Sequence, residues 1–234
     1  MGKSAEKLIK PSTHSCGHCE SRQTGALCRT SDKVREIIDR VKLTQSFTPG
    51  QTIFYEGGDA LGLFLIEEGL VKLESHSIKG GTHTLRLMTN GGVLGYRALF
   101  AQETYKASAV CVEPTKLCFI PKADLMMVIQ QHPETALNLL EYISKDLGSA
   151  ENKWLDQMEK GAPERIAAAL LFFEAKFGDL DWTRKEIAQW AGTTPETVIR
   201  TLSSFEKDGL ISQIERKIRI LHREKLVNMT AIIY

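Results

Sequence analysis

The hydrophobic and polar positions change their period along the chain, and each period predicts a different kind of structure. Short apolar runs broken by glycine fill much of the first half, and an apolar residue every three or four positions marks the middle. Short runs of strand-forming residues indicate β-structure, whereas a period near 3.6 residues indicates helix. The sequence therefore predicts an α+β protein with its sheets toward the N-terminus.

Five strand-like runs predict an antiparallel sandwich or barrel within residues 31–132. Glycine-rich turns separate these runs, as expected between short strands. The runs are Thr52–Tyr55, Leu61–Glu67, Leu70–Ser75, Thr84–Met88 and Ala107–Val112. A polar segment that carries cysteine and histidine, residues 1–30, precedes this domain.

The middle of the chain predicts one long helix over residues 133–161, with Pro133 at its start and Gly161 at its end. Five positions follow the alternating three- and four-residue spacing of a coiled-coil seam: Leu140, Ile143, Leu147, Ala150 and Trp154. Such a seam either packs on its own domain or pairs two chains. Because it carries no charged residue that would hold two chains apart, we expect a dimer, with or without a cofactor.

Two short helices joined by a glycine turn are predicted near the C-terminus. Thr183 and Glu186 have the spacing of a capping box at the start of the first helix. Gly192 supplies the turn, and Thr194 followed by Pro195 is suited to begin the second helix. This arrangement is a helix-turn-helix, whose second helix enters the major groove of DNA.

We expect this element within a DNA-binding domain over residues 162–234 that opens with an apolar helix and ends in a β-hairpin wing over Ile211–Ile220. The Glu196 carboxylate can accept a hydrogen bond from cytosine, and the Arg200 guanidinium can bind guanine in bidentate fashion. The alternative is an ordinary surface ion pair between them. The candidate DNA contacts are Thr183, Arg184, Thr194, Glu196, Thr197 and Arg200.

Composition limits the class of protein and where it acts. Hydrophobic residues make up 42% and charged residues 25%, as in a globular chain. The net charge is only +1, so DNA binding must depend on a local patch. No apolar run approaches a membrane span, and the N-terminus is too polar for a signal peptide, so we expect a cytoplasmic protein without membrane association. No catalytic motif is present, so we expect no enzyme.

Cysteine placement suggests metal or redox chemistry. Cys16, Cys19 and Cys28 lie close together, whereas Cys111 and Cys118 lie far downstream. In a reducing cytoplasm, such a cluster favours metal binding over disulfides.

Four sequence blocks carry a resemblance to a known family. They are FTPGQTIFYEGGD, LFLIEEGLVKL, GGVLGYRALF and PETVIRTLSSFEKDGLI. In these blocks and their order, the chain resembles bacterial transcription regulators of the cyclic-AMP receptor/fumarate-nitrate regulator (CRP/FNR) family over about Phe47–Leu221. The resemblance implies a β-roll sensor domain, a long dimerisation helix and a winged helix-turn-helix. It also implies a homodimer that binds palindromic DNA sites and contacts RNA polymerase, with Glu196 and Arg200 at base-reading positions.

The resemblance leaves two modes of sensing open, of which the first uses a small-molecule effector. The cyclic-nucleotide branch has a glutamate and an Arg–Ser pair in its pocket, whereas this chain has Val93 and Lys106–Ala107 near those positions. We therefore expect no cyclic AMP binding. A different effector, nucleotide or otherwise, would occupy a pocket formed by Gly92, Leu94, Gly95, Lys106 and Ser108.

The second mode is an oxygen- or redox-sensitive [4Fe–4S] cluster. In the iron–sulfur branch of the family, three N-terminal cysteines and one from the β-roll hold the cluster. The matching ligands here are Cys16, Cys19, Cys28 and Cys118. Zinc is a further alternative, held by the three N-terminal cysteines with His14 or His18. A last alternative is that the cysteines bind no metal. Cys111 is expected in the core.

Overall fold

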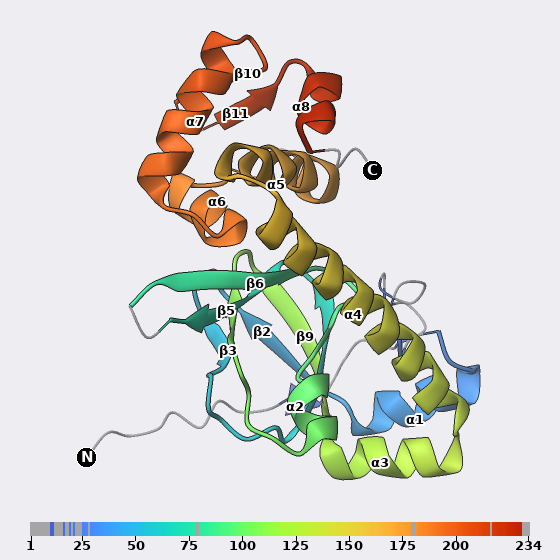
Figure 1. Cartoon of the computed structure of the whole chain (residues 1–234). Coiled ribbons are helices and arrows are strands. Elements are labelled where there is room, and N and C mark those ends of the chain that lie inside the picture. The colour runs from blue at the N-terminus through green and yellow to red at the C-terminus, as the bar shows by residue number, and fades with distance from the viewer. Residues whose placement is uncertain are drawn as a thin grey trace. The chain divides into compact units, whose positions relative to one another are not determined.

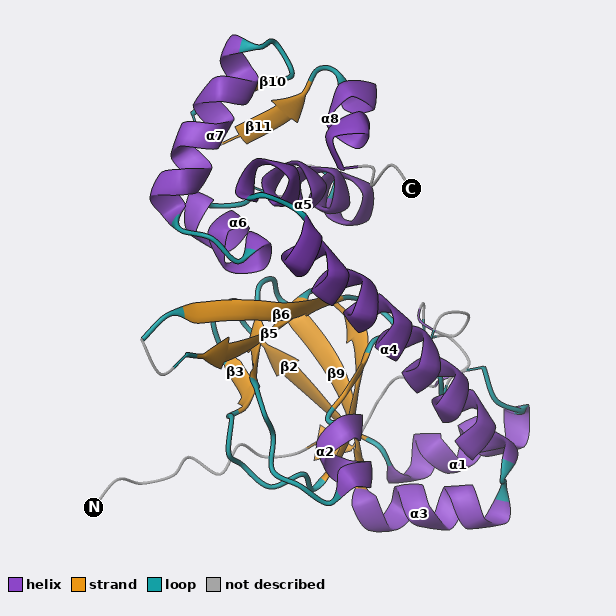
Figure 2. Ribbon diagram, viewed as in Figure 1, coloured by secondary structure: helices purple, strands orange, loops and turns teal. Residues whose placement is uncertain are grey.

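The computed structural model contains helices, two antiparallel sheets and a hairpin (Figures 1 and 2), so the predicted α+β class is confirmed. It describes residues 10–11, 16, 19, 21, 25–27, 29–77, 80–178, 181–215 and 217–230. The chain divides into two compact units. The first comprises Met1–His76 and Leu85–Asp146, and the second comprises Ser77–Thr84 and Leu147–Tyr234.

Two antiparallel sheets form the sandwich of the β-roll. One sheet has the strand order β1-β2-β9-β4-β7 and the other has β3-β8-β5-β6. The strands are β1 Lys10–Pro11, β2 Leu43–Phe47, β3 Thr52–Phe54, β4 Gly62–Glu68, β5 Val71–His76, β6 Thr82–Met88, β7 Val93–Leu94, β8 Ser108–Cys111 and β9 Thr115–Pro121. Each of the five strand runs expected from the sequence overlaps one of these strands. The apolar core between the sheets includes Ile66, Val71 and Leu117.

Strands β2 and β9, which the sequence pattern misses, lie in the middle of the five-stranded sheet. Strand β9 pairs with β2 on one side and with β4 on the other, so that Cys118 lies opposite Thr44 and Leu65. Successive side chains of β9 point to opposite faces of the sheet. Leu117 therefore faces the core between the sheets, whereas Cys118 faces a second core on the other side.

Helices cover that second face of the five-stranded sheet. They are α1 Asp32–Val41, α2 Tyr96–Ala101, α3 Lys122–Gln131 and the first part of α4 Glu134–Glu159. Helix α1 begins at Ser31, whose side chain accepts a hydrogen bond from the Val34 N–H. Val34 and Ile38, one helical turn apart, are buried in the second core together with Leu139 from α4.

Helix α4 is the long helix that the heptad spacing predicts, and it is continuous from Glu134 to Glu159. One of its faces is packed in the first unit, where the Tyr142 hydroxyl accepts a hydrogen bond from the Val93 N–H at 3.0 Å. The predicted seam lies on another face. The exposed fractions of the side chains there are 59% for Leu140, 58% for Leu147 and 65% for Trp154. Ile143 is half-buried, and Ala150 is exposed. A single chain thus leaves an extended apolar face of α4 uncovered.

The second unit contains the helix-turn-helix and its wing. Its other elements are α5 Ala162–Phe177, α6 Arg184–Ala191, α7 Pro195–Lys207, β10 Ile211–Ile214, β11 Lys217–Ile220 and α8 Arg223–Thr230. Strands β10 and β11 form the predicted hairpin, with Ile211 paired to Ile220. The expectation that this unit ends in the hairpin is wrong, because α8 follows. Leu226 of α8 is fully buried, and α8 packs on α5.

No helix in the described part of the chain is long and apolar enough to span a bilayer.

The aromatic core of the second unit provides a test of its packing. Phe173 is 3% exposed and stacks on Trp182 with 4.1 Å between ring centroids. We predict that Phe173→Ala lowers the free energy of unfolding of this unit by about 3–5 kcal/mol, because it leaves a cavity. Ile214→Ala, at a 69% exposed position, should change it by less than about 0.5 kcal/mol.

Urea denaturation followed by tryptophan fluorescence measures this difference, since all three tryptophans lie in the second unit. Equal midpoints for the two variants would contradict the packing described.

Candidate functional site

The turn between α6 and α7 is built from the capping residues that the sequence indicates. The Thr183 hydroxyl accepts a hydrogen bond from the Glu186 N–H at 3.2 Å, and the Glu186 carboxylate accepts one from the Thr183 N–H at 2.8 Å. This is a complete capping box. Gly192 ends α6 with φ of 63°, a left-handed conformation that costs glycine little.

Helix α7 has one buried and one exposed face. Its start is capped by the Thr194 hydroxyl, which accepts a hydrogen bond from the Thr197 N–H at 3.3 Å. Val198, Leu202 and Phe205 are buried against the rest of the unit. The exposed positions of α7 include Glu196, Ile199, Arg200, Ser203 and Ser204. Glu196 and Arg200 thus lie one turn apart on a solvent-facing surface, where side chains can reach base edges.

The other candidate DNA contacts lie at the two helix starts. Thr183 and Thr194 are exposed N-cap residues, while Thr197 and Arg184 are half-buried. Arg184 donates a hydrogen bond to the Gln213 side chain on β10. Its guanidinium therefore also connects the first helix of the motif to the wing.

Two positioning interactions of this motif have no signal in the sequence pattern. Gln213 is held by Glu206 of α7, whose carboxylate accepts from the Gln213 backbone N–H at 2.7 Å. Arg165 of α5 donates through Nε to the Ala191 carbonyl at 2.8 Å. Because Ala191 ends α6, this bond satisfies a carbonyl that has no partner within the helix. Each contact joins residues of two different elements, so the spacing pattern within one element does not reveal it.

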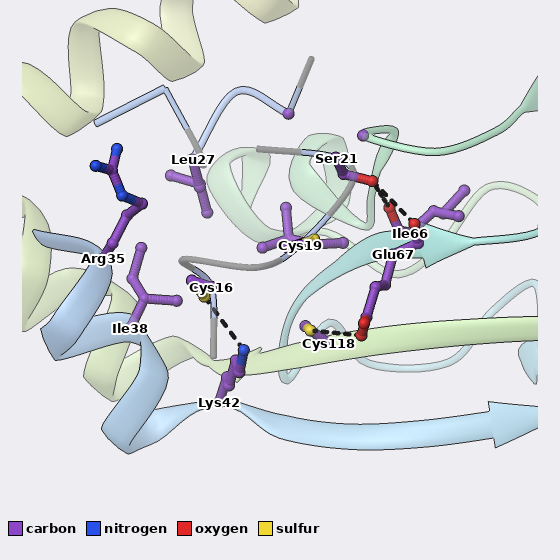
Figure 3. A pocket seen from close by; sticks show the side chains of 13 residues that line it. Cys16, Cys19, Ser21, Leu27, Arg35, Ile38, Lys42, Ile66, Glu67 and Cys118 are labelled. Atoms are coloured by element: carbon purple, nitrogen blue, oxygen red, sulfur yellow. Dashed lines mark hydrogen bonds between the residues drawn. The ribbon is translucent and has the colours of Figure 1, made fainter. Parts of the chain in front are cut away.

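Three of the predicted metal ligands line a single cavity in the first unit. Cys16, Cys19 and Cys118 lie around a space of about 470 Å³, part of which is open to solvent (Figure 3). All three are free thiols. The fourth predicted ligand, Cys28, and both candidate histidines, His14 and His18, lie outside the described residues.

The cavity wall combines the N-terminal segment, α1 and the sheet. Its apolar part includes Leu27, Ile38, Leu65 and Ile66. Among the described residues, no three cysteine, histidine or acidic side chains stand close enough together to hold a metal ion as they are. Cys111, by contrast, is 1% exposed in the core between the sheets, as expected.

Hydrogen bonds attach the cysteine-bearing segment at two places. The Cys16 N–H donates to both carboxylate oxygens of Asp39, at 2.8 and 2.9 Å. The Ser21 hydroxyl donates to the carbonyls of Ile66 and Glu67 on β4 (Figure 3). Sequence reasoning missed Asp39 and Ser21, because neither forms a motif with the cysteines. The two attachments hold Cys16 and Cys19 over the face of the sheet that carries Cys118.

The two most buried thiols of the cavity are neutral at ordinary pH. Burial, and next a hydrogen bond with Asp39, raise the pKa of Cys16 to about 12, although the Lys42 ammonium opposes this. Burial raises the pKa of Cys118 to about 11, again against the influence of Lys42. Since metals bind the thiolate, ligation at this site requires both thiols to lose a proton.

The predicted effector residues are less clearly arranged as a binding site. Gly92 and Gly95 are half-buried and Leu94 is 1% exposed. Lys106 is exposed, and the buried Ser108 hydroxyl already accepts a hydrogen bond from the Glu56 N–H at 3.0 Å. The backbone of Gly95, with φ of 85°, lies against the Tyr105 ring, which stacks on Phe54. Aromatic side chains thus occupy the space beside this glycine.

Comparison with known proteins matches both halves of the chain. The family model of the cyclic nucleotide-binding domain matches residues 44–132, and that of the Crp-like helix-turn-helix domain matches residues 164–229. The cyclic AMP receptor protein of Thermus thermophilus is 33% identical over 168 residues, which are 70% of this chain and 77% of that protein. Electron transport regulator A of Shewanella oneidensis is 28% identical over 225 residues, 89% of this chain and 88% of that protein.

The fold agrees with these relatives. The crystal structure of a CRP/FNR-family transcriptional regulator from Thermus thermophilus superposes with a TM-score of 0.69 and 28% sequence identity, over 80% of this chain and 97% of that one. Both matched domains occur in the same order here, and the second contains the capped helix pair and wing described above. The chain therefore belongs to the CRP/FNR family of transcriptional regulators and carries a helix-turn-helix DNA-binding domain.

Proposed function

We propose that this regulator is a homodimer whose binding to inverted-repeat promoter sites is gated by an oxygen- or redox-sensitive [4Fe–4S] cluster held by Cys16, Cys19, Cys28 and Cys118. One observation carries the proposal. Cysteines from the N-terminal segment and from β9, about a hundred positions apart in the sequence, line the same cavity. A buried free cysteine is common by itself, but three around one cavity suit a shared ligand.

The chemistry of the donor set fits the cluster. Four thiolates are the usual ligands of a [4Fe–4S] cluster, and the chain has four cysteines in the required regions. Leu27 lines the cavity, and Cys28 is the next residue in the chain. The bound cluster would supply a group that reacts with oxygen. A zinc site would need His14 or His18 together with the three N-terminal cysteines and would leave Cys118 unused.

The packing of the first unit offers a route from the cysteines to α4. Cys16, Leu27 and Cys118 share one buried core with Leu139 of α4. Arg29 also lies 3.8 Å from Glu141 of α4. A change in the cysteine-bearing segment therefore alters the packing on the buried face of α4. The exposed face of the same helix carries the dimer seam. This links the sensor to the dimer without a further element.

The DNA-binding half of the proposal depends on the exposed face of α7. Arg200 and Glu196 would read bases, while Thr183, Arg184, Thr194 and Thr197 would contact phosphates and set the register. In a two-fold symmetric dimer the two recognition helices enter successive major grooves about 34 Å apart, which requires an inverted repeat. By family resemblance the dimer would act in the cytoplasm and contact RNA polymerase. No catalytic activity is assigned.

A second candidate keeps the DNA-binding half but uses a small-molecule or nucleotide effector. The match to the cyclic nucleotide-binding domain favours it. Against it, Val93 is fully buried where cyclic-nucleotide receptors have a pocket glutamate, and Lys106 is exposed. Thermal-shift screening separates the two candidates, since only an effector site would give strong stabilisation of metal-free protein by a small molecule.

The cluster assignment predicts which cysteines retain iron. Protein purified without air should be brown and contain about four iron atoms per chain, and Cys118→Ser should lose most of this iron. Cys111→Ala is the matched control, since Cys111 is also buried on a strand but lies in the other core. Iron and sulfide analysis with visible spectroscopy measures this. A colourless, iron-free wild-type protein would refute the cluster.

Base reading and phosphate contact should respond differently to mutation. Arg200→Ala should weaken the free energy of binding to the preferred DNA site by about 1–3 kcal/mol and relax the preference at one base pair. Arg184→Ala should weaken binding to all sequences alike. It should also reduce the slope of log affinity against log salt concentration by about 1, the loss of one phosphate contact. Fluorescence anisotropy on matched and scrambled duplexes over a range of salt distinguishes these effects. An unchanged base preference in Arg200→Ala would show that another residue reads that base.

The exposed seam of α4 predicts the oligomeric state. Metal-stripped protein should have the mass of two chains in light scattering, because the apolar seam has no acidic side chain to separate them. Leu147→Asp, which places a charge at a 58% exposed seam position, should shift the mass toward one chain. A single-chain mass for the wild-type protein would contradict the seam assignment.

A further inference from the structure

Two charged side chains at the end of α1 contact Cys16. The Lys42 ammonium donates to the Cys16 sulfur at 3.2 Å (Figure 3). It also lies 2.7 Å from the Asp39 carboxylate. Both oxygens of the same carboxylate accept the single Cys16 N–H in a bifurcated hydrogen bond. Asp39 and Lys42 thus hold both the backbone and the sulfur of the first cysteine.

The burial of Lys42 is the unusual feature of this arrangement. Its side chain is only 3% exposed, whereas the Asp39 side chain is 24% exposed. Burying an ammonium removes its hydration at a large free-energy cost, and an ion pair does not always recover that cost. An apolar residue at this position would fill the same space without the cost. The free-energy cost of burying the Lys42 ammonium therefore indicates that its charge has a function.

The position of the charge relative to the cavity indicates that function. Lys42 itself lines the cavity, together with Cys16, Cys19 and Cys118. Its ammonium is hydrogen-bonded to the Cys16 sulfur of the N-terminal segment, and Cys118 of β9 lines the same cavity. The Glu67 carboxylate on the other side of the cavity is paired with Lys116 at 2.7 Å. Lys42, although paired with Asp39, is thus a cation that also contacts the Cys16 sulfur in this cavity.

We propose that Asp39 and Lys42 are positioning and charge-compensating residues of the cluster site, an inference that rests on the cluster function proposed above. Asp39 fixes the backbone of Cys16, and Lys42 offsets the negative charge that thiolate ligands bring into the cavity. Charges and hydrogen bonds around such a cluster set its reduction potential. Together the pair sets how readily this cluster gives up an electron.

Charge compensation makes predictions of opposite sign for the two residues. A cation beside the cluster stabilises the more negative, reduced state, and a carboxylate destabilises it. Removing the Lys42 charge should therefore make the reduction potential more negative and bleaching in air faster. Removal of the Asp39 charge should make the potential less negative and bleaching slower. A purely structural role would loosen the site in both variants and shift them in the same direction.

The test compares Lys42→Met with Asp39→Asn in full-length protein reconstituted with iron and sulfide under argon. Methionine keeps the length of the side chain without its charge, and asparagine keeps an oxygen that accepts from the Cys16 N–H. Lys42→Arg conserves the charge and should retain the wild-type potential. Lys72→Met is the matched control, since Lys72 is a partly buried lysine paired with Glu74 at 2.8 Å on the other sheet.

The readouts are iron content per chain and the midpoint potential from anaerobic reductive titration. We expect opposite shifts in Lys42→Met and Asp39→Asn, with Lys42→Arg and Lys72→Met unchanged. If Lys42→Arg retains iron and Lys42→Met does not, this result also supports a requirement for positive charge at position 42. Iron-loaded variants with unchanged potentials, or shifts of the same sign, would overturn this inference and leave the cluster assignment intact. Wild-type protein that takes up no iron would overturn both.

Discussion

The packing of the cysteine-bearing segment on the Cys118 face of β9 is the contact on which the rest of the account depends. Alternation along β9 sends Leu117 into the sandwich and Cys118 to the helix-covered face. The N-terminal segment reaches that face because Cys16 is bound by Asp39 and Ser21 is bound by β4. Without these attachments, Cys16 and Cys19 would not share a cavity with Cys118 on a distant strand.

The same core connects the cysteine site to helix α4. A protein interior is close-packed, so a change in the volume or charge of a ligand at the cysteines must be accommodated by neighbouring side chains. Leu139 is one of those neighbours, and the seam residues lie on another face of the same continuous helix. The proposed control by the cysteine site and the proposed pairing of chains thus meet on α4, while the proposed base recognition depends on the capped helix α7 in the second unit.

The sequence predicts the elements that local chemistry defines, and it misses those that depend on distant contacts. Thr183, Gly192 and Thr194 identify the helix-turn-helix because caps and turns are local. Helix α1 is obscured by its many charged residues, and β9 lacks glycine boundaries. The candidate ligand Cys118 came from family resemblance, whereas Asp39 and Lys42 could be found only in three dimensions. The assignments of the DNA-contacting, effector and cluster residues remain predictions.

In the proposed regulator, the state of the cysteine site controls DNA binding. The most direct test of this control measures the affinity of one sample for its selected inverted-repeat duplex, first under argon and then after air has bleached the cluster. Allosteric coupling of about 1–3 kcal/mol predicts an affinity change of about 5- to 150-fold between the two states. The same affinity before and after cluster loss would show that the cysteine site does not gate this regulator.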